Sequence, residues 1–225
     1  MSIDLVSVCK SYTQGNASIS VLNGLTASID EGAVCVICGE SGCGKTTLLS
    51  IMGAIESIDS GKVSIQGISV HDLSGSEADA FRRNVVSLVF QSHFLLDDFT
   101  ALENVMLPLI LQGVRSRIAK KRATELLERV GLIERIIHKP QELSGGESQR
   151  VAVARALITD ASVILADEPT GNLDQENAKK VVSLLVRLAK EEKRILVLVT
   201  HNREFLTFGT CNYELSQGFL QTIIT

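Results

Sequence analysis

One stretch, Gly39 to Thr47, limits what this chain can fold into more than any other. It reads GESGCGKTT and fits the phosphate-binding pattern G-x-x-x-x-G-K-[ST]. The apolar run 33–38 precedes it and is typical of a buried parallel strand, and the pattern from Thr46 to Met52 is typical of a helix. In that setting glycines let successive backbone N–H groups point at phosphate oxygens, with help from the helix dipole. The setting disfavours the alternative, a glycine-rich turn with a surface lysine, and predicts a nucleoside triphosphate site.

Side chains of this loop have separate expected tasks. Lys45 would reach the β- and γ-phosphates, and the Thr46 hydroxyl would bind Mg²⁺. Cys43 has no evident part in phosphate binding, but its place inside the loop means that alkylation is expected to block nucleotide binding.

Composition narrows the classes of function. The 225 residues suit one large domain or a core with a small insertion, and a net charge of −4 gives no support to nucleic acid as the main partner. Apolar runs are far shorter than a membrane span, and the N-terminus lacks a signal-peptide pattern. Five cysteines, an odd number, argue against a disulfide framework, and Cys35 and Cys38 are expected in the core, on opposite faces of a strand. We expect a cytoplasmic chain that meets membranes only through partners.

A second glycine motif, Leu143–Glu147, reads LSGGE and opens a helix expected from Ser148 to Leu157. Ser144 and Glu147 alone could be no more than a capping box. Two adjacent glycines at a helix start are harder to explain in that way, because glycine weakens helices, whereas uncluttered backbone amides there can bind phosphate. The distance of this motif from the first one in the chain suggests that a phosphate is held from two sides.

Polar residues also follow the buried strands. Asp167 and Glu168 end the apolar run that starts at Ser162, and ligands of open α/β sheets bind at that end of the strands. Asp167 would help to hold Mg²⁺ and Glu168 would orient or deprotonate a water, the alternative being two solvated charges at a loop. His201 follows the strand 195–200, and we expect it to contact the γ-phosphate. Gln91 follows the strand 85–90 and could point into the site or cap a turn.

Residues 92–150 are helical in pattern and lie between strands, which indicates an inserted helical subdomain. Thr100–Glu103 has the form of a capping box for a helix that continues to about Gln112, and 117–130 is an amphipathic helix. Further elements are expected as strands at 3–10 and 18–30, a short polar helix at 76–83, a helix at 176–192 and a closing hairpin at 213–220.

These residues resemble one family over essentially the whole chain, the ATP-binding subunit of ABC transporters. Its motifs correspond to Gly39–Thr46 (Walker A), Gln91 (Q-loop), Leu143–Glu147 (signature), Leu165–Glu168 (Walker B), Asn172–Asp174 (D-loop) and His201 (switch histidine). The resemblance implies a single ABC ATP-binding domain over 1–225. Its fold is that of an α/β P-loop NTPase, with a RecA-like parallel-sheet core, an N-terminal antiparallel β subdomain and the helical subdomain inserted at about 92–150.

The resemblance also implies an ATPase whose two copies form a head-to-tail dimer around ATP, with Mg²⁺ as cofactor. Tyr12, which could equally be a surface residue, then becomes the aromatic that stacks on adenine. The implied catalytic residues are Glu168, His201 and Gln91, and the implied metal ligands are Thr46, Gln91 and Asp167. The implied ATP contacts are Tyr12, Gly39, Glu40, Ser41, Gly42, Cys43, Gly44, Lys45, Thr46 and Thr47, with Ser144, Gly145, Gly146, Glu147 and Asp174.

Within the family, the chain is similar to the group that contains the LolD, MacB and FtsE ATPases. The segment Phe94–Leu109 is most similar to the lipoprotein-releasing LolD type, and it lies where a membrane partner is expected. This implies two transmembrane permease subunits of the LolC/LolE type and a peripheral position on the cytoplasmic face of the inner membrane. Departures from the family pattern are Ser148 for a larger polar residue, Asn202 for the usual Asp, and a short, divergent tail.

Other functions are weighed against this one. The same fold could serve macrolide or peptide efflux, or cell division. A soluble ABC ATPase that acts on DNA or ribosomes is disfavoured, because the chain has no coiled-coil insertion, no second cassette and no basic surface expected from its net charge. A P-loop small-molecule kinase would leave the LSGGE motif unexplained.

Overall fold

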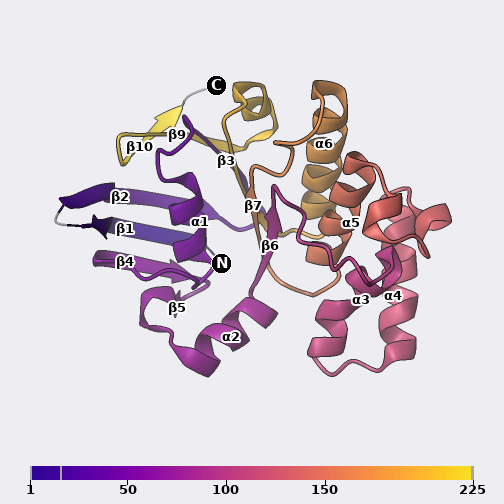
Figure 1. Ribbon diagram of the computed structural model, residues 1–225. Coiled ribbons are helices and arrows are strands. Elements are labelled where there is room, and N and C mark those ends of the chain that lie inside the picture. Colours follow the sequence, from indigo (N-terminus) through magenta and orange to yellow (C-terminus); the bar gives the residue numbers. More distant parts are fainter. Residues whose placement is uncertain (1, 16, 224–225) are drawn as a thin grey trace.

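The computed structural model describes residues 2–15 and 17–223, and they form two sheets with helices between and around them (Figure 1). The first sheet is antiparallel, in the order β2-β1-β4-β5. Its strands are β1 (Ser2–Gln14), β2 (Ala17–Asp30), β4 (Ser60–Ile65) and β5 (Ile68–Ser69). The expected strands 3–10 and 18–30 are therefore confirmed, and both extend further toward the turn that joins them.

The second sheet has six strands in the order β10-β9-β3-β8-β7-β6. All neighbours are parallel except β9 and β10, which form the expected closing hairpin. The strands are β3 (Val34–Cys38), β6 (Val86–Phe90), β7 (Val163–Asp167), β8 (Ile195–Thr200), β9 (Cys211–Ser216) and β10 (Phe219–Ile223). Every residue of β3, β7 and β8 is buried, because helices and the antiparallel sheet cover both faces. The fold is that of a P-loop NTPase.

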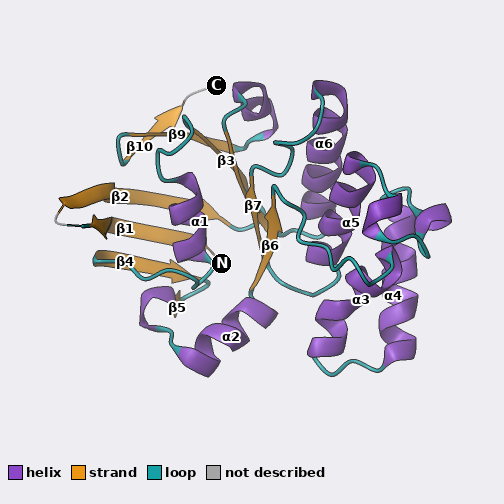
Figure 2. Ribbon diagram, in the orientation of Figure 1, coloured by secondary structure: helices purple, strands orange, loops and turns teal. Residues whose placement is uncertain are grey.

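The helices divide between the two faces of the parallel sheet (Figure 2). The α-helices are α1 (Lys45–Met52), α2 (Gly75–Asn84), α3 (Ala101–Leu111), α4 (Ser116–Arg129), α5 (Gly145–Leu157) and α6 (Gln175–Glu191). The short 3₁₀ helices are η1 (Val70–Asp72), η2 (Ile133–Arg135), η3 (Pro140–Glu142) and η4 (Arg203–Phe208). Helix α1 packs with the antiparallel sheet, and α3 to α6 form the other side with one another.

Alternate side chains of β3 point into two different hydrophobic cores. Val34, Val36 and Cys38 pack with the helices α3 to α6, whereas Cys35 and Ile37 pack with α1 and the antiparallel sheet. The period of two along a strand produces this division. It confirms that Cys35 and Cys38 are core residues on opposite faces.

Helix ends follow the side-chain chemistry of the sequence. Thr100 accepts a hydrogen bond from Glu103 N–H and Glu103 accepts one from Thr100 N–H, which confirms the capping box of α3. Ser144 and Glu147 form a second box, so α5 begins at Gly145 and not at Ser148. Helix α5 also continues to Leu157, past the end expected for the helical subdomain at residue 150.

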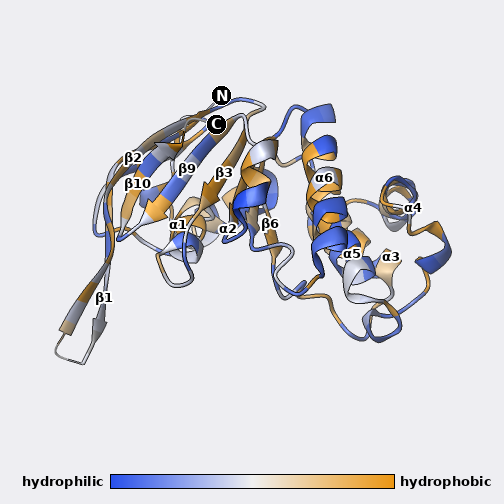
Figure 3. Cartoon of the chain, turned by 90° about the horizontal axis from the view of Figure 1, so that it is seen from above, coloured by the Kyte–Doolittle hydropathy of each residue, from blue (hydrophilic) through white to orange (hydrophobic). Residues whose placement is uncertain are grey.

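Figure 3 shows how apolar faces build the interior. Helix α6 alternates between apolar and polar surfaces, and its residues Ala178, Val181, Leu185 and Leu188 are buried, as the helical spacing predicts. In the same view the C-terminal end of β1 and the N-terminal end of β2 project beyond the rest of the molecule.

Candidate nucleotide-binding site

The glycine loop between β3 and α1 is closely packed, which is why it needs glycine. A Cβ atom on Gly39 would lie 2.4 Å from the carbonyl oxygen of Leu215. Gly44, with φ of 108°, is the N-cap of α1, and a Cβ atom there would lie 2.9 Å from Val21 Cγ1. The loop therefore passes close to β2 and β9 and leaves the N-terminus of α1 open toward solvent, where its amides and dipole favour an anion.

Lys45, the first residue of α1, folds back over this loop. Its Nζ atom donates hydrogen bonds of 2.8 Å to the carbonyl oxygens of Gly39 and Glu40, and the residue is only 5% exposed. The same atom lies 3.5 Å from Glu168 Oε1. A buried ammonium held by two carbonyls and one carboxylate is placed to neutralise phosphate oxygens in front of the loop.

Glu168 follows β7 with a left-handed backbone, φ of 43°, and its N–H donates to the Val199 carbonyl oxygen. This turn directs the carboxylate toward both Lys45 and His201. Glu168 Oε2 lies 2.9 Å from His201 Nδ1 and accepts a 3.2 Å hydrogen bond from the His201 N–H. The strained conformation is held by the pairing of β7 with β8, and it brings an acid, a base and a lysine to one place.

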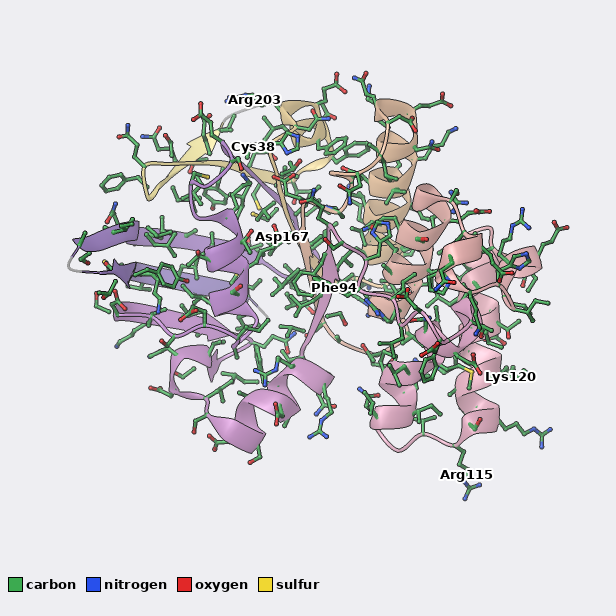
Figure 4. The ribbon with its side chains drawn as sticks, in the orientation of Figure 1. Cys38, Phe94, Arg115, Lys120, Asp167 and Arg203 are labelled. Carbon is green, nitrogen blue, oxygen red and sulfur yellow. The ribbon has the colours of Figure 1, made fainter. Side chains whose placement is uncertain are left out.

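Asp167, the last residue of β7, lies next to α1 at the end of the parallel sheet (Figure 4). It is buried, and its Oδ1 atom has no hydrogen-bond partner. Burial raises the pKa of this carboxyl group, and the charge of Glu168 adds to the effect, while the hydrogen bond from Thr46 and the charge of Lys45 oppose it. A buried carboxylate with a free oxygen next to a threonine hydroxyl is suited to a hard cation.

Lys45, Glu168 and His201 line one cavity of about 550 Å³, and Asp167 lies behind its wall, not on it. Its walls come from β2, the glycine loop, α1 and the carboxyl ends of β6, β7 and β8, which is the edge where α/β folds bind ligands. The lining residues are Val21, Ser41, Gly42, Gly44, Lys45, Thr46, Thr47, Gln91, Glu168 and His201.

Gln91 reaches this cavity from the end of β6. Its Nε2 atom donates a 3.3 Å hydrogen bond to Asn172 Oδ1, and a Cβ atom on Gly171 would lie 2.5 Å from the same nitrogen. Gln91 is therefore held against the segment after β7. The sequence left open whether its side chain points into the site or caps a turn, and the structure places it at the site.

The signature residues do not line the cavity. Ser144 and Glu147 cap α5, and Glu147 also accepts a hydrogen bond from Arg135. Hydrogen bonds to the carboxylate from Ser144 and Arg135 lower the pKa of Glu147. A Cβ atom on Gly145 would lie 3.5 Å from Leu173 Cδ2, so this helix start packs beside the segment that leads into α6. Within this chain the two glycine motifs do not meet.

Besides Gly39, Glu40 and Asp167, which are described above, three further expected residues do not line the cavity. Tyr12 is 39% exposed on β1, and Lys10 Nζ lies 5.2 Å from its ring centroid. Asp174 caps α6 by accepting hydrogen bonds from Asn177. Cys43 is half-buried and packs against the core under α1.

Sequence reasoning missed two residues of this region. Val21 lines the cavity from β2, but an apolar strand residue gives no signal in the sequence. Arg155 of α5 donates hydrogen bonds of 2.5 and 2.6 Å to the carbonyl oxygens of Phe94 and His93, and so holds the segment after Gln91. Those partners are about 60 positions away in the chain, and no motif connects them.

The residues around Asp167 fit Mg²⁺. Within residues 2–15 and 17–223, no three His, Cys, Asp or Glu side chains form a metal cluster. Thr46, Gln91 and Asp167 instead offer a hydroxyl, an amide and a carboxylate oxygen. This set suits Mg²⁺, which usually has few protein ligands and also binds substrate phosphates.

The glycine loop, its lysine and the carboxylates at the strand ends define a P-loop nucleotide-binding protein. A sequence profile of the family described as "ABC transporter" matches residues 22–171. The chain belongs to this ABC transporter family.

Named relatives show which members of the ABC transporter family the chain is similar to. The chain is 45% identical to the lipoprotein-releasing system ATP-binding protein LolD of Treponema denticola, over 99% of this chain and 100% of that protein. It is 46% identical to LolD of Treponema pallidum, over 98% and 96%. A dimeric structure of the ATP-binding cassette MJ0796 in a post-hydrolysis state, bound to ADP and Pi, has a TM-score of 0.90 and 37% identity over 99% of both chains. Among the described helices of this chain, none combines the length and apolar character needed to cross a membrane.

Proposed function

We propose that this chain is the ATP-hydrolysing subunit of an ABC transporter that releases lipoproteins from the inner membrane. It would work from the cytoplasmic face through two separate transmembrane subunits of the LolC/LolE type. The contact between Glu168, His201 and Lys45 at the open end of α1 is the observation that supports hydrolysis. Identities of 45% and 46% to LolD proteins over nearly the whole chain support lipoprotein release as the function. They favour it over a role in efflux or cell division.

The cavity residues can divide the reaction among them. Loop amides and Lys45 bind the β- and γ-phosphates, and a bound phosphate competes with Glu168 for the Lys45 ammonium, which is 3.5 Å from that carboxylate. Glu168 then orients or deprotonates the attacking water, and His201, 2.9 Å away, holds Glu168 and reaches the γ-phosphate. Mg²⁺ held by Thr46, Gln91 and Asp167 would neutralise phosphate charge when bound.

The substitution Glu168→Gln tests the hydrolytic assignment. We expect ATP to bind with unchanged affinity, hydrolysis to fall by about a hundredfold or more because the base is lost, and an ATP-bound dimer to accumulate. Fluorescent-nucleotide titration, phosphate release and size-exclusion chromatography measure these three quantities. Glu176→Gln, which removes an exposed carboxylate at the start of α6, is the matched control. Turnover of Glu168→Gln at the wild-type rate would show that another group activates the water.

A head-to-tail homodimer is part of this proposal. The helix start at Ser144–Gly146 has backbone amides that suit phosphate, yet it lies outside the cavity of its own chain. The signature helix of a second copy would complete each site. The dimeric MJ0796 cassette, which is 37% identical, supports this arrangement.

A groove of about 220 Å³ between α2, β6, α3 and α5 supports a place for the transmembrane subunits. Its wall is mainly apolar and includes Leu88, Leu107 and Leu111. Near its α5 wall, Arg155 binds the carbonyl oxygen of Phe94, an apolar residue that is 61% exposed. The occupant that we propose is a cytoplasmic segment of the transmembrane subunit, because this region is most similar to the LolD type and is tied to Gln91 at the nucleotide site.

The partner and cargo are tested by a pull-down in mild detergent from native membranes, with identification of the integral proteins that accompany the tagged chain. Four-span subunits with a large periplasmic domain, in a complex that retains lipoproteins, are the expected result. An efflux-type partner, a two-protein division complex or no membrane protein at all would overturn lipoprotein release and leave the ATPase chemistry in place.

A further inference from the structure

The hairpin formed by α3 and α4 ends in a strongly basic tip. Residues 104–124 contain five cationic side chains and no Asp or Glu, although the whole chain has a net charge of −4. The cationic residues are Arg115, Arg117, Lys120, Lys121 and Arg122. Such a separation of charge indicates an anionic partner more than a generally solvated surface.

Most of this charge is not neutralised by the part of the chain that the structure describes. Arg115, Arg117 and Lys120 are exposed, and none of their side chains has an ion-pair or hydrogen-bond partner among the residues that the structure describes. Lys121 lies 3.8 Å from Glu125, and Arg122 lies 2.9 Å from Asp160. Figure 4 shows Arg115 and Lys120 at the end of the hairpin that is remote from the sheets, with Arg115 extending beyond the ribbon.

Apolar side chains lie among these cations. Leu111 is 65% exposed and Ile118 is 51% exposed, and both belong to the same end of the hairpin. Exposed aliphatic residues beside Lys and Arg are typical of surfaces that bind the headgroup region of an anionic bilayer. Residues 104–124 contain no aromatic side chain on which a base could stack, so single-stranded nucleic acid fits the tip less well.

The tip also adjoins the groove assigned to the transmembrane subunits. Leu111 lines both surfaces, and the Gln112 side chain donates a 2.7 Å hydrogen bond to the Arg83 carbonyl oxygen, which fixes α3 to α2 at the groove edge. Arg83 is itself exposed at this edge. A transmembrane partner in the groove would therefore bring the tip toward the bilayer.

We propose that this basic tip, the five cations from Arg115 to Arg122 with Leu111 and Ile118, binds the anionic phospholipid headgroups of the membrane directly, with Arg83 beside it. This goes beyond the expectation that the chain meets the membrane only through partners. It relies on the proposed function in one respect, which is that a transmembrane partner turns the tip toward the bilayer. The contact would hold the helical hairpin near the bilayer while the transmembrane subunits occupy the groove.

Vesicle flotation with the full purified chain tests the proposal, since it needs no partner protein. The probes are vesicles of 30% phosphatidylglycerol in phosphatidylethanolamine and vesicles of phosphatidylcholine alone. We expect binding to the anionic vesicles only, and weaker binding as salt is raised. The variant Arg115→Gln, Arg117→Gln, Lys120→Gln should bind about a hundredfold more weakly, because each cation near such a surface is worth about fivefold.

The matched control also removes three exposed cations, but outside the tip. It carries Lys62→Gln, Lys180→Gln and Lys190→Gln. It should lose less than threefold, and both triple variants should hydrolyse ATP at the wild-type rate, since none of the six residues lines the nucleotide cavity. Equal binding to neutral vesicles, equal loss in the two variants, or wild-type binding of the tip variant would each overturn the lipid contact.

A pull-down of the same tip variant distinguishes this failure from failure of the proposed function. If the wild-type chain ignores vesicles and the tip variant no longer recovers the transmembrane subunits, the cations bind an acidic protein segment and the lipid proposal is wrong. If the wild-type chain binds anionic vesicles yet recovers no transmembrane subunit, the proposed function is wrong and the lipid contact stands.

Discussion

Asp167 illustrates how one residue can lower stability in favour of binding. Its carboxyl group is buried beside Glu168 with one oxygen unpartnered, and burial raises its pKa. A raised pKa in the folded state means that the ionised form opposes folding at neutral pH, and that this cost disappears as the pH falls through the raised value. A bound cation would offset the cost of burying the Asp167 carboxylate.

We therefore predict that Asp167→Asn stabilises the free protein at pH 7 by about 1 kcal/mol, a rise in melting temperature of about 2–4 °C. The same variant should lose most of the additional stabilisation that Mg²⁺ with ATP gives the wild type. Differential scanning calorimetry with and without the ligand measures both effects. A lower melting temperature for the free variant would contradict the assignment of Asp167 as a cation ligand whose buried charge destabilises the free protein.

Among single residues, the sequence predicted those cavity residues that follow strands or belong to the glycine loop. Glu168 and His201 could be nominated because the carboxyl ends of parallel strands converge, and Lys45 because it belongs to the glycine-loop motif. Val21 and Arg155 could not, because their roles depend on which distant backbone passes beside them. The left-handed backbone of Glu168 is likewise a product of the pairing of β7 with β8 and has no local sequence signal.

Among the elements, the start of α3 gives a prediction about pH. Glu103 accepts hydrogen bonds from the Thr100 N–H and hydroxyl, and these lower its pKa below the ordinary value of 4.5. A lowered pKa in the folded state means that the carboxylate stabilises the protein above about pH 4.5, and that this stability is lost as the pH falls through the lowered value.

Glu103→Gln should therefore be less stable than the wild type by about 0.5 kcal/mol at pH 7, and the difference should shrink below pH 4.5. Urea unfolding at a series of pH values measures it. Glu128→Gln, at an exposed position of α4, should show no such trend, and a difference for Glu103→Gln that persists at pH 3 would be evidence against the charged cap.

Arg155 connects helix α5 to the segment after Gln91, two parts of the chain to which the proposed function gives different partners. It lies on α5, whose N-terminus is the signature motif, and it holds two carbonyl groups of the segment between Gln91 and α3. We expect Arg155→Gln to leave ATP affinity within about twofold, because Arg155 itself does not line the nucleotide cavity, and to lower kcat several-fold, because the segment that follows Gln91 loses an anchor.

Titration of a fluorescent nucleotide and steady-state kinetics separate the two quantities. Arg122→Gln, which removes a surface ion pair with Asp160, is the control and should change neither. A rise in Kd for ATP with unchanged kcat would mean that Arg155 supports the nucleotide site and does not act as the proposed link.

Element boundaries were predicted most accurately where a side chain fixes them. The capping box places the start of α3 correctly. The expected start of α5 at Ser148 is three residues late, because Ser144 and Glu147 form a capping box and the helix begins at Gly145. The strand order β10-β9-β3-β8-β7-β6 could not be read from the sequence, because it depends on pairings between distant segments. Only the family resemblance supplied the arrangement.

For the whole molecule, the separation of the two glycine motifs has a consequence for assembly. Lys45 lies at the cavity, and the signature residues of the same chain pack against Leu173 at the start of α6. If each nucleotide is held by Lys45 of one copy and Gly146 of another, then the two motifs of one chain serve two different sites. A Lys45 defect disables the site at the chain's own glycine loop, and a Gly146 defect disables the site at the glycine loop of the other copy. A chain that completed its own site would not behave in this way.

Mixing two inactive variants therefore tests the head-to-tail dimer. Lys45→Ala should abolish hydrolysis by removing a phosphate ligand, and Gly146→Asp should abolish it by placing a carboxylate at the second helix start. In an equimolar mixture, half of the dimers combine both variants, and each of these contains one site with an intact Lys45 and an intact Gly146.

Phosphate release from the mixture should recover to about a quarter of the wild-type rate if the two sites act independently, and to less if they act together. A mixture of Lys45→Ala with an otherwise wild-type chain sets the upper reference, and each variant alone sets the lower one. If both motifs acted within one chain, every chain in the mixture would remain defective. Recovery would then be absent at all mixing ratios, and the dimeric site would have to be abandoned.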